Sequence, residues 1–583
     1  MSPPPATAFA IGVDFGTNSA RALIVDCADG REVASHVVPY PSGEAGILLD
    51  PADPNLARQH PGDYVEGLEQ SIRGAVEAAA GDADFDVQRV VGIGIDTTGS
   101  TPIPVDQTGT PLGMTDRFRD ELAAQAWLWK DHTAHAEAAE ITRLAEQRGE
   151  PYLAKCGGTY SSEWFWSKLL RCRRVAPEVF AAAHSWVEMA DWIPAYACGN
   201  TDPATLVRGV CAAGHKAMYH ADWGGLPSED FLAALDPELA AVRGRLYDRA
   251  VPSSEPAGRL AADVAERCGL AAAQGRGEGG GGGGGIPVAA GAFDAHHGAV
   301  GAGAAPGTLV KIMGTSTCDI STWPIDEDRP LPDIPGLCGI VPGSVVAGQY
   351  GLEAGQSAVG DLFNWVAQKL APQTYTDAGD THVALTREAE NLAPGATGLI
   401  YLDWNNGNRT VLVNPRLTGL LLGQTLHTTA AEIYRAVVEA TAFGARKIVD
   451  RFEEHGVKID RVINCGGIAD KSPFVMQIYA DVLDRPMLIS RSGQTCALGA
   501  AIFGSIVGGV HPTAEAAQHA MTGIKDVTYQ PNPEAVAVYA ELFEMYTQLH
   551  DAFGGVTASA DLGQVMPRLM DLRDRARRGN ASV

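Results

Sequence analysis

At 583 residues the chain is too long for a single hydrophobic core, so it should divide into two or more domains. Its formal net charge of −26 argues against a nucleic-acid partner, because basic side chains supply most of the affinity for a phosphate backbone. The charge does not exclude a bound nucleotide, since backbone N–H groups and Mg²⁺ hold phosphate without net positive charge.

Three further features indicate where the protein works. The ten cysteines include no CxxC pair, which argues against a disulfide framework or a cysteine-rich zinc site and favours a reducing compartment. The stretch MSPPPATAFAIGV lacks the basic and long apolar regions of a signal peptide. Apolar runs of about 18 residues, the length needed to cross a membrane, are also missing. We therefore expect a cytoplasmic protein.

The first predicted elements form a hairpin. Strands over residues 10–13 and 20–25 are joined by the tight turn Asp14-Phe15-Gly16-Thr17-Asn18-Ser19, which offers side-chain donors at its tip. The segment EVASHVVPY is a plausible third strand of the same meander. A helix over residues 64–80 and a buried strand over 89–95, which ends at Asp96, complete this unit.

The next part of the chain is predicted to be helical. Residues 116–149 are rich in Ala, Glu, Gln and Leu, and the region up to residue 226 is dense in aromatic side chains. Trp164–Trp166 are interpreted as core residues rather than as a sugar platform. The glycine tract over residues 275–285 cannot pack a core, so we expect an exposed loop there. A phosphate loop is disfavoured because no strand leads into the tract.

The stretch from Ile286 to Ile320 carries the chemistry. A short apolar run ends at a lone acid, Asp294, and a second apolar run opens into the turn Gly314-Thr315-Ser316-Thr317. A carboxylate beside a loop of free N–H and hydroxyl donors suits phosphoryl transfer, in which positioning and charge stabilisation do most of the work. Asp is also a favoured helix cap, so the residue types alone leave Asp294 open between a base and a cap.

The second half repeats the strand–turn–strand pattern of the first half, which indicates a duplicated core. A long helix is expected over residues 429–454, and a shorter one over 358–370. The strand over 461–465 ends at Gly466-Gly467, where a flat ring or a phosphate could approach the backbone. A helix should begin after Ser472, with Pro473 in its first position. A strand over 486–490 and a helix over 495–506 follow.

These loops resemble a known family. The turns at Asp14–Ser19, Gly314–Thr317 and Gly466–Gly467 are similar to the three nucleotide loops of the actin-like, ribonuclease-H-fold ATPases, and Asp294 just before the second loop is typical of the FGGY carbohydrate kinases. The segments CAAGHKAMYH, AGAFDAHHGAVGAG, GLEAGQSAVGDLFNW and SSEWFWSKLL most resemble the L-ribulokinase branch of that family. The similarity runs from about residue 8 to about residue 550.

The resemblance implies an α/β protein with two ribonuclease-H-like domains, over residues 1–285 and 286–583. A helical insertion over about residues 116–226 belongs to the first domain, and the active site lies in the interdomain cleft. It also implies these roles: Asp294 as the general base; Asp14 as the acid that holds Mg²⁺; Thr17, Asn18, Ser19, Gly314 and Thr315 around the ATP phosphates; Gly466, Gly467 and Asp470 around adenosine; and Gly99, Lys216, Asp294 and Glu353 around the sugar.

Several alternatives stay open on the residues themselves. Lys216 could be a surface lysine, and Glu353 could cap the helix after it. Gly99 would leave a slightly roomier sugar pocket than a larger residue. A metal site at His296 and His297 is disfavoured, because no third His or Cys stands at ligand spacing.

The resulting hypothesis is an ATP- and Mg²⁺-dependent ketopentose kinase that converts L-ribulose to L-ribulose 5-phosphate in arabinose catabolism. Alternatives are another FGGY kinase acting on xylulose, D-ribulose, a pentitol or glycerol, and a chaperone-like switch ATPase. The expected partners are the sugar and ATP, without nucleic acid or membrane, in a homo-oligomer such as a dimer.

Overall fold

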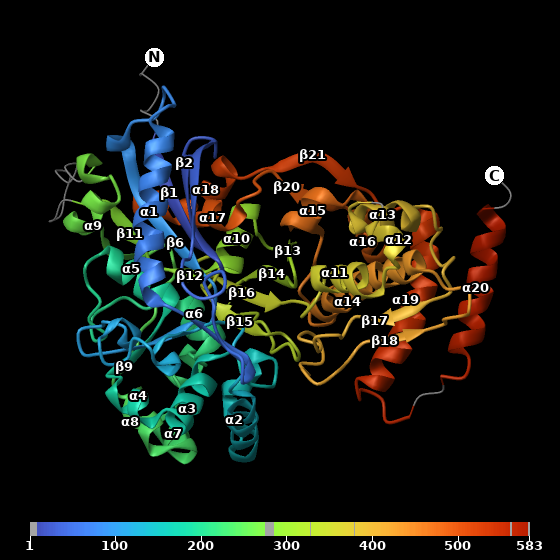
Figure 1. Cartoon of the computed structure of the whole chain (residues 1–583), viewed down its shortest axis with the longest axis horizontal. Coiled ribbons are helices and arrows are strands. Elements are labelled where there is room, and N and C mark those ends of the chain that lie inside the picture. Colours follow the sequence, from blue (N-terminus) through green and yellow to red (C-terminus); the bar gives the residue numbers. More distant parts are fainter. Residues whose placement is uncertain (1–7, 274–284, 327, 378, 560–561, 581–583) are drawn as a thin grey trace.

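The computed structural model describes residues 8–273, 285–326, 328–377, 379–559 and 562–580 (Figure 1). Almost all of the glycine tract over residues 275–285 lies outside these ranges. None of the helices within them is long and apolar enough to cross a membrane. Two seven-stranded sheets form the centres of the two halves of the molecule.

The first sheet is built around a parallel pair of buried strands. Strand β1 (Phe9–Phe15) pairs antiparallel with β2 (Ser19–Asp26), which pairs antiparallel with β3 (Glu32–Pro39). On its other side β1 runs parallel to β6 (Val90–Thr97). Strands β11 (Pro287–Ala289) and β12 (Ala292–Phe293) run parallel to β6, and β10 (Pro256–Arg259) closes the edge. The predicted hairpin, meander and fourth strand are confirmed.

The second sheet repeats this order. Strand β13 (Thr308–Met313) pairs antiparallel with β14 (Thr317–Pro324), and β14 with β16 (Gln349–Ala354). On its other side β13 runs parallel to β19 (Arg461–Cys465), which runs parallel to β20 (Met487–Ser490). Strands β15 (Gly339–Pro342) and β21 (Ile524–Tyr529) form the edges. The two sheets therefore show the duplication expected of paired ribonuclease-H-like domains.

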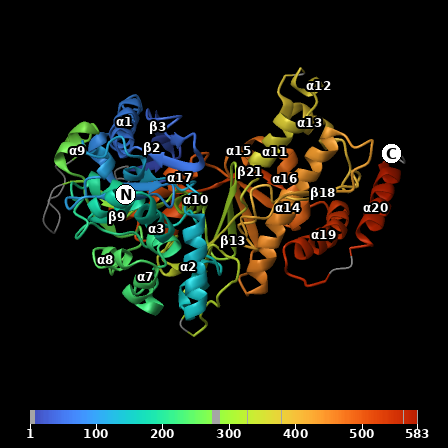
Figure 2. The same ribbon diagram turned by 60° about the horizontal axis from the view of Figure 1, so that its bottom comes forward.

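Two helices lie between the sheets. Helix α10 (Asp294–Ala302) follows β12, and α17 (Thr495–Val507) packs on β1, β6 and α10 although it comes late in the chain (Figures 1 and 2). The first sheet admits α17 closely because it presents glycines. A Cβ atom on Gly12 would lie 1.7 Å from the Ala497 carbonyl oxygen, and one on Gly94 would lie 1.8 Å from that of Ala500.

The insertion is only partly as predicted. Of residues 116–149, only α2 (His135–Arg148) is α-helical; a 3₁₀ turn (Leu122–Ala124) and strand β8 (Ala126–Trp127) precede it. Composition favoured helix over this whole stretch, but β8 pairs with β5 (Asp53–Gln59), and that tertiary contact overrides local propensity. Trp164 and Trp166 lie in the buried core of the insertion, as predicted. Both views place the insertion helices at the lower edge of the first half.

The remaining elements surround these layers. The first half also contains α1 (Pro61–Ala79), α3 (Phe165–Val175), α4 (Pro177–Ala182), α5 (Met189–Ala197), α6 (Val210–Lys216), α7 (Glu229–Leu235), α8 (Pro237–Arg243), α9 (Ala262–Arg267), β4 (Leu48–Asp50), β7 (Pro102–Val105) and β9 (Ser185–Glu188). The second half contains α11 (Gly360–Trp365), α12 (Gln373–Thr376), α13 (Thr381–Glu390), α14 (Ala430–Glu454), α15 (Gly467–Lys471), α16 (Pro473–Leu483), α18 (Ala514–Met521), α19 (Pro533–Phe553), α20 (Val565–Asn580), β17 (Ile400–Leu402) and β18 (Leu420–Leu422).

The division between the sheets falls later in the chain than the predicted domain boundary. The prediction assigned residues from 286 onward to the second domain, whereas β11 and β12 pair with β6 of the first sheet. Helix α10, which follows directly, contacts both sheets. Asp294 therefore stands where the chain leaves the first sheet and enters the second half. The extent of each domain as a separate unit stays a prediction.

Candidate active site

Three carboxylates gather at the carboxyl ends of neighbouring strands in the first sheet. Asp14 and Asp96 are register partners near the ends of β1 and β6. Phe293 of β12 pairs with Thr97, so Asp294 begins α10 beside the same edge. The helix cap of α10 is Phe293, and the Asp294 carboxylate accepts a 2.6 Å hydrogen bond from the Ala295 N–H. This placement leaves the other Asp294 oxygen available to a ligand.

The carboxylates shift one another's protonation. Burial and then the negative charge of Asp14 raise the pKa of Asp294 to about 7. Burial also raises the pKa of Asp14, and burial together with Asp14 and Asp294 raises that of Asp96 well above its usual value. Asp96 shares a side-chain hydrogen bond with Asp14, and His297 Nδ1 lies 3.7 Å from one of its oxygens. Such a group of acids is fully ionised only when a cation joins it.

A second charged group joins the two halves of the molecule. The Lys216 ammonium, at the end of α6, lies 3.0 and 3.1 Å from the two carboxylate oxygens of Glu353 on β16. Both side chains are buried, with relative exposures of 7% and 9%. Burial opposes the charge of Glu353, but Lys216, His215 and His296 outweigh it and hold its pKa well below the usual value. The surface and capping interpretations of these two residues are therefore wrong.

Aromatic rings enclose the ammonium group. Lys216 Nζ lies 5.4 Å from the centroid of the Trp164 ring and 5.7 Å from that of Phe293. Gly99 faces the same phenylalanine, because a Cβ atom at this position would lie 2.1 Å from Phe293 Cδ1. The space beside Gly99 is thus occupied by the Phe293 ring and is not an enlarged pocket.

The two predicted phosphate loops are equivalent hairpin turns in the two sheets. In the first turn, the Trp129 indole donates to Thr17 Oγ1 at 3.1 Å, and the Asn18 amide donates to the Ala45 carbonyl at 2.6 Å. Ser19 begins β2. In the second turn, the Gly314 N–H donates to the Ser316 carbonyl at 2.9 Å, and the carbonyl of Thr315 is bound by N–H groups at the start of α11.

The predicted adenosine loop follows β19. Gly466 has a φ of +94°, and a Cβ atom there would lie 2.5 Å from the Met313 carbonyl oxygen, so the ends of β19 and β13 approach closely. Beside Gly467, no described atom lies within 4 Å of an added Cβ. Asp470 forms a 2.8 Å ion pair with Lys525. This loop follows a strand of the second sheet, whereas Asp14 and Asp96 lie on strands of the first.

Two family descriptions match most of the chain. Residues 9–301 match the N-terminal domain of the FGGY family of carbohydrate kinases, and residues 309–507 match its C-terminal domain. The chain belongs to the FGGY family of carbohydrate kinases. The family predicted from the loops is confirmed, and with it the class of enzyme: an ATP-dependent sugar kinase.

Relatives of this kinase extend over nearly its whole length. It is 41% identical to a ribulokinase of Shouchella clausii, with 98% of this chain and 99% of the relative covered. It is 40% identical to a ribulokinase of Mycolicibacterium smegmatis, with 95% of each covered. The similarity therefore includes the insertion as well as both sheets.

Solved structures agree on the fold. A xylulose kinase from Rhodospirillum rubrum has a TM-score of 0.73 at 23% identity, with 94% of this chain and 99% of that chain covered. A glycerol kinase from Plasmodium falciparum, solved with ADP, has a TM-score of 0.68 at 14% identity, with 92% and 98% covered. The predicted pair of ribonuclease-H-like, actin-like α/β domains is confirmed.

Sequence reasoning left some residues of this kinase site without a role. Asp96 ends a buried strand as Asp14 does, and that shared position was a usable signal. For Lys168 of α3, the sequence carried no such signal. Its buried ammonium donates to the carbonyls of Ser100, Trp127 and Leu128, and so fixes the chain just after Gly99. Burial lowers the pKa of Lys168 to about 8.

Proposed function

We propose that this kinase transfers the γ-phosphoryl group of ATP to the 5-hydroxyl of L-ribulose, a step of arabinose catabolism. The observation that carries the proposal is the buried pair of Lys216 and Glu353 close to Asp294, at the place where the two halves meet. A buried donor–acceptor pair beside a carboxylate base suits a polyhydroxylated substrate. The names of the full-length relatives support the choice of sugar.

Asp294 is proposed as the base. A sugar hydroxyl is a poor nucleophile near neutral pH, and a carboxylate within hydrogen-bond distance can orient it and accept its proton as the O–P bond forms. Asp294 begins α10 directly after β12, so the sheet and the helix both hold it in place. Its raised pKa makes it a stronger base than an ordinary aspartate.

Asp14 and Asp96 fit Mg²⁺. They offer carboxylate oxygens, which this ion prefers, and the buried hydrogen bond that the two carboxyl groups share holds a proton that the ion would replace. Bound there with the nucleotide, Mg²⁺ would neutralise charge on the phosphates. The turns at Thr17–Ser19 and Gly314–Thr315 supply neutral N–H and hydroxyl donors. Gly466, Gly467 and Asp470 remain the proposed contacts of adenosine.

The test is ADP release with Mg·ATP across a panel of ketopentoses, pentitols and glycerol. The strongest stimulation is expected with L-ribulose. Stronger stimulation by another polyol would preserve the chemistry and replace the substrate. No stimulation by any sugar would contradict the proposal.

Activity should depend on pH through Asp294. Burial and Asp14 raise its pKa to about 7, and only the ionised form can accept a proton. We therefore expect kcat/KM for the sugar to rise with pH and to level off above about pH 7. Initial rates at limiting sugar and limiting Mg·ATP, which report the free enzyme, measure this when enzyme stability is checked at each pH. If kcat/KM instead rose near pH 4, where an ordinary aspartate ionises, this role of Asp294 would be contradicted.

The Gly99→Ala variant should weaken sugar binding. The added methyl group meets the Phe293 ring, which must move, and this ring precedes Asp294 and lies beside Lys216. We expect KM for the sugar to rise about tenfold while ATP affinity is unchanged, since a misplaced side chain of this kind costs 1–3 kcal/mol. The matched control is Gly81→Ala, where the nearest atom to the new methyl is 3.7 Å away. Equal KM values for both variants would refute the role of this contact.

A further inference from the structure

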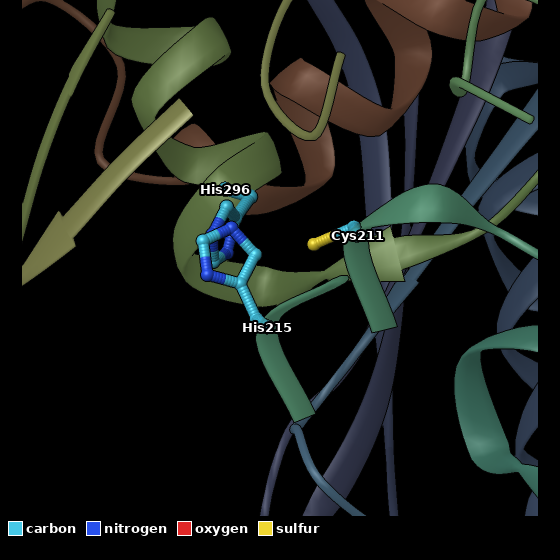
Figure 3. Close-up of side chains that lie close together, drawn as sticks. All are labelled: Cys211, His215 and His296. Carbon is cyan, nitrogen blue, oxygen red and sulfur yellow. The ribbon is translucent and has the colours of Figure 1, made fainter. Parts of the chain in front are cut away.

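Three possible metal ligands converge beside the pair of Lys216 and Glu353. Cys211 and His215 lie one turn apart on α6, and His296 lies on α10 (Figure 3). One ligand atom of each side chain lies within 4.8 Å of the others, and all three residues are buried. The sequence argued against a metal at His296 because no third ligand stands nearby in the chain. The structure brings two ligands to it from a helix some eighty residues earlier.

The two histidine rings meet through their Nε2 atoms. The Nε2 atoms of His215 and His296 lie 3.0 Å apart. His215 Nδ1 lies 3.2 Å from a Glu353 oxygen but makes no hydrogen bond with a described residue, and His215 Nε2 also lies 3.0 Å from Ser344 Oγ. His296 Nδ1 has no hydrogen-bond partner among the described residues, so in the metal-free protein one Nε2 carries a proton and donates it to the other. A metal ion would replace that shared proton, with both rings protonated on Nδ1 and both Nε2 lone pairs directed at the cation.

The donor set selects the kind of cation. Sulfur and imidazole nitrogen favour zinc and similar transition metals over Mg²⁺, which takes oxygen ligands. Zinc holds nitrogens at about 2.0–2.1 Å, so two tetrahedral nitrogen ligands are separated by about 3.3 Å, close to the separation seen here. Cys211 binds as the thiolate and releases its proton on coordination. A tetrahedral set needs about 3.6 Å between sulfur and nitrogen, and the ligand atoms here lie within 4.8 Å of one another, so the sulfur closes each gap by up to about 1.2 Å.

Glu353 lies beside the three ligands and would become the fourth by moving toward them. Its Oε2 atom lies 3.8 Å from His296 Nε2, and the same carboxylate holds Lys216. We propose that Cys211, His215, His296 and Glu353 form a zinc-class site that, when filled, withdraws Glu353 from Lys216 and inhibits the kinase. Metal binding stands on the geometry alone, whereas the inhibition rests on the proposed role of the Lys216–Glu353 pair in sugar binding.

Binding is tested on the full chain with Co²⁺ alone as the probe. The wild type should bind one Co²⁺ with a thiolate-to-cobalt charge-transfer band. Cys211→Ala and His296→Gln should lose the band, while Cys268→Ala, a change at another fully buried cysteine, should keep it. Absence of the band in the wild type, or its persistence in Cys211→Ala, would overturn the site.

Inhibition is tested separately with Zn²⁺ in the sugar-dependent ADP assay. Zn²⁺ should compete with the sugar and not with Mg·ATP, and Mg²⁺-saturated EDTA should restore activity. Cys211→Ala should keep its basal rate and need about tenfold more Zn²⁺ for half-inhibition, the usual effect of losing one metal partner. Equal sensitivity of both proteins would overturn the inhibitory role. Failure of every sugar to stimulate ADP release would instead count against the proposed function and leave the cobalt result standing.

Discussion

Asp294→Asn should lower kcat for sugar phosphorylation by about 10³-fold, within the range that a general base contributes. The amide keeps the shape of the side chain but cannot accept the hydroxyl proton. ATP binding, measured by calorimetry, should be unchanged. A kcat within tenfold of the wild type would show that another group takes the proton.

Measuring thermal stability shows whether the loss of kcat in Asp294→Asn comes from lost chemistry or from misfolding. The pKa of Asp294 is about 7 in the folded protein, above its value in an unfolded chain, because burial and Asp14 disfavour the charge. The residue therefore contributes less stability as pH rises from about 4 to 7, and the neutral amide removes that penalty. At pH 8 the Tm of Asp294→Asn should equal or exceed that of the wild type. Asp403→Asn, at a buried aspartate bonded to Gln356 and Tyr546, is the control and should keep its kcat.

Lys216→Met should raise KM for the sugar by about 100-fold, equivalent to about 3 kcal/mol. The substitution keeps the apolar stem between Trp164 and Phe293 and removes the ammonium that holds Glu353. The remaining carboxylate is buried without its partner, so the Tm should also fall. ATP affinity should not change, because this pair lies outside the predicted nucleotide loops.

Two further variants distinguish sugar binding from stability. In the double variant Lys216→Met with Glu353→Gln, no charge of the pair remains, so the Tm should recover while the sugar KM stays high. Arg435→Met breaks another buried pair, with Glu439 inside α14, and should lower the Tm without changing the sugar KM. Recovery of sugar affinity in the double variant would refute a direct role for the pair.

Local signals explain what could be predicted. An apolar strand that ends in Asp and a polar turn marked Asp14, and a Ser-Pro pair marked the start of α16, where Ser472 caps the helix. In the long helix α14, apolar spacing and the capping box of Thr429 and Glu432 act together. Each of these features lies within a few residues of the chain, so their physical causes can be read from sequence.

The features that could not be predicted depend on contacts between segments that are far apart in the chain. Lys216 and Glu353 are separated by 137 residues, and only the apposition of α6 and β16 makes them an ion pair. His215 and His296 are likewise far apart in the chain, and the packing of α6 beside α10 brings their rings together. Residues 116–134 were expected to be helical, but pairing of β8 with β5 decides their conformation. The roles of the individual site residues remain predictions that the variants above can test.

The position of α17 affects how the chain can fold during synthesis. This helix, residues 495–507, covers β1 and β6, which are made at the start of the chain. Until it leaves the ribosome, the glycine-lined face of the first sheet stays uncovered. A fragment ending near residue 301 would expose that face permanently and would tend to associate with other copies. The N-terminal half thus depends on the C-terminal half to complete its core.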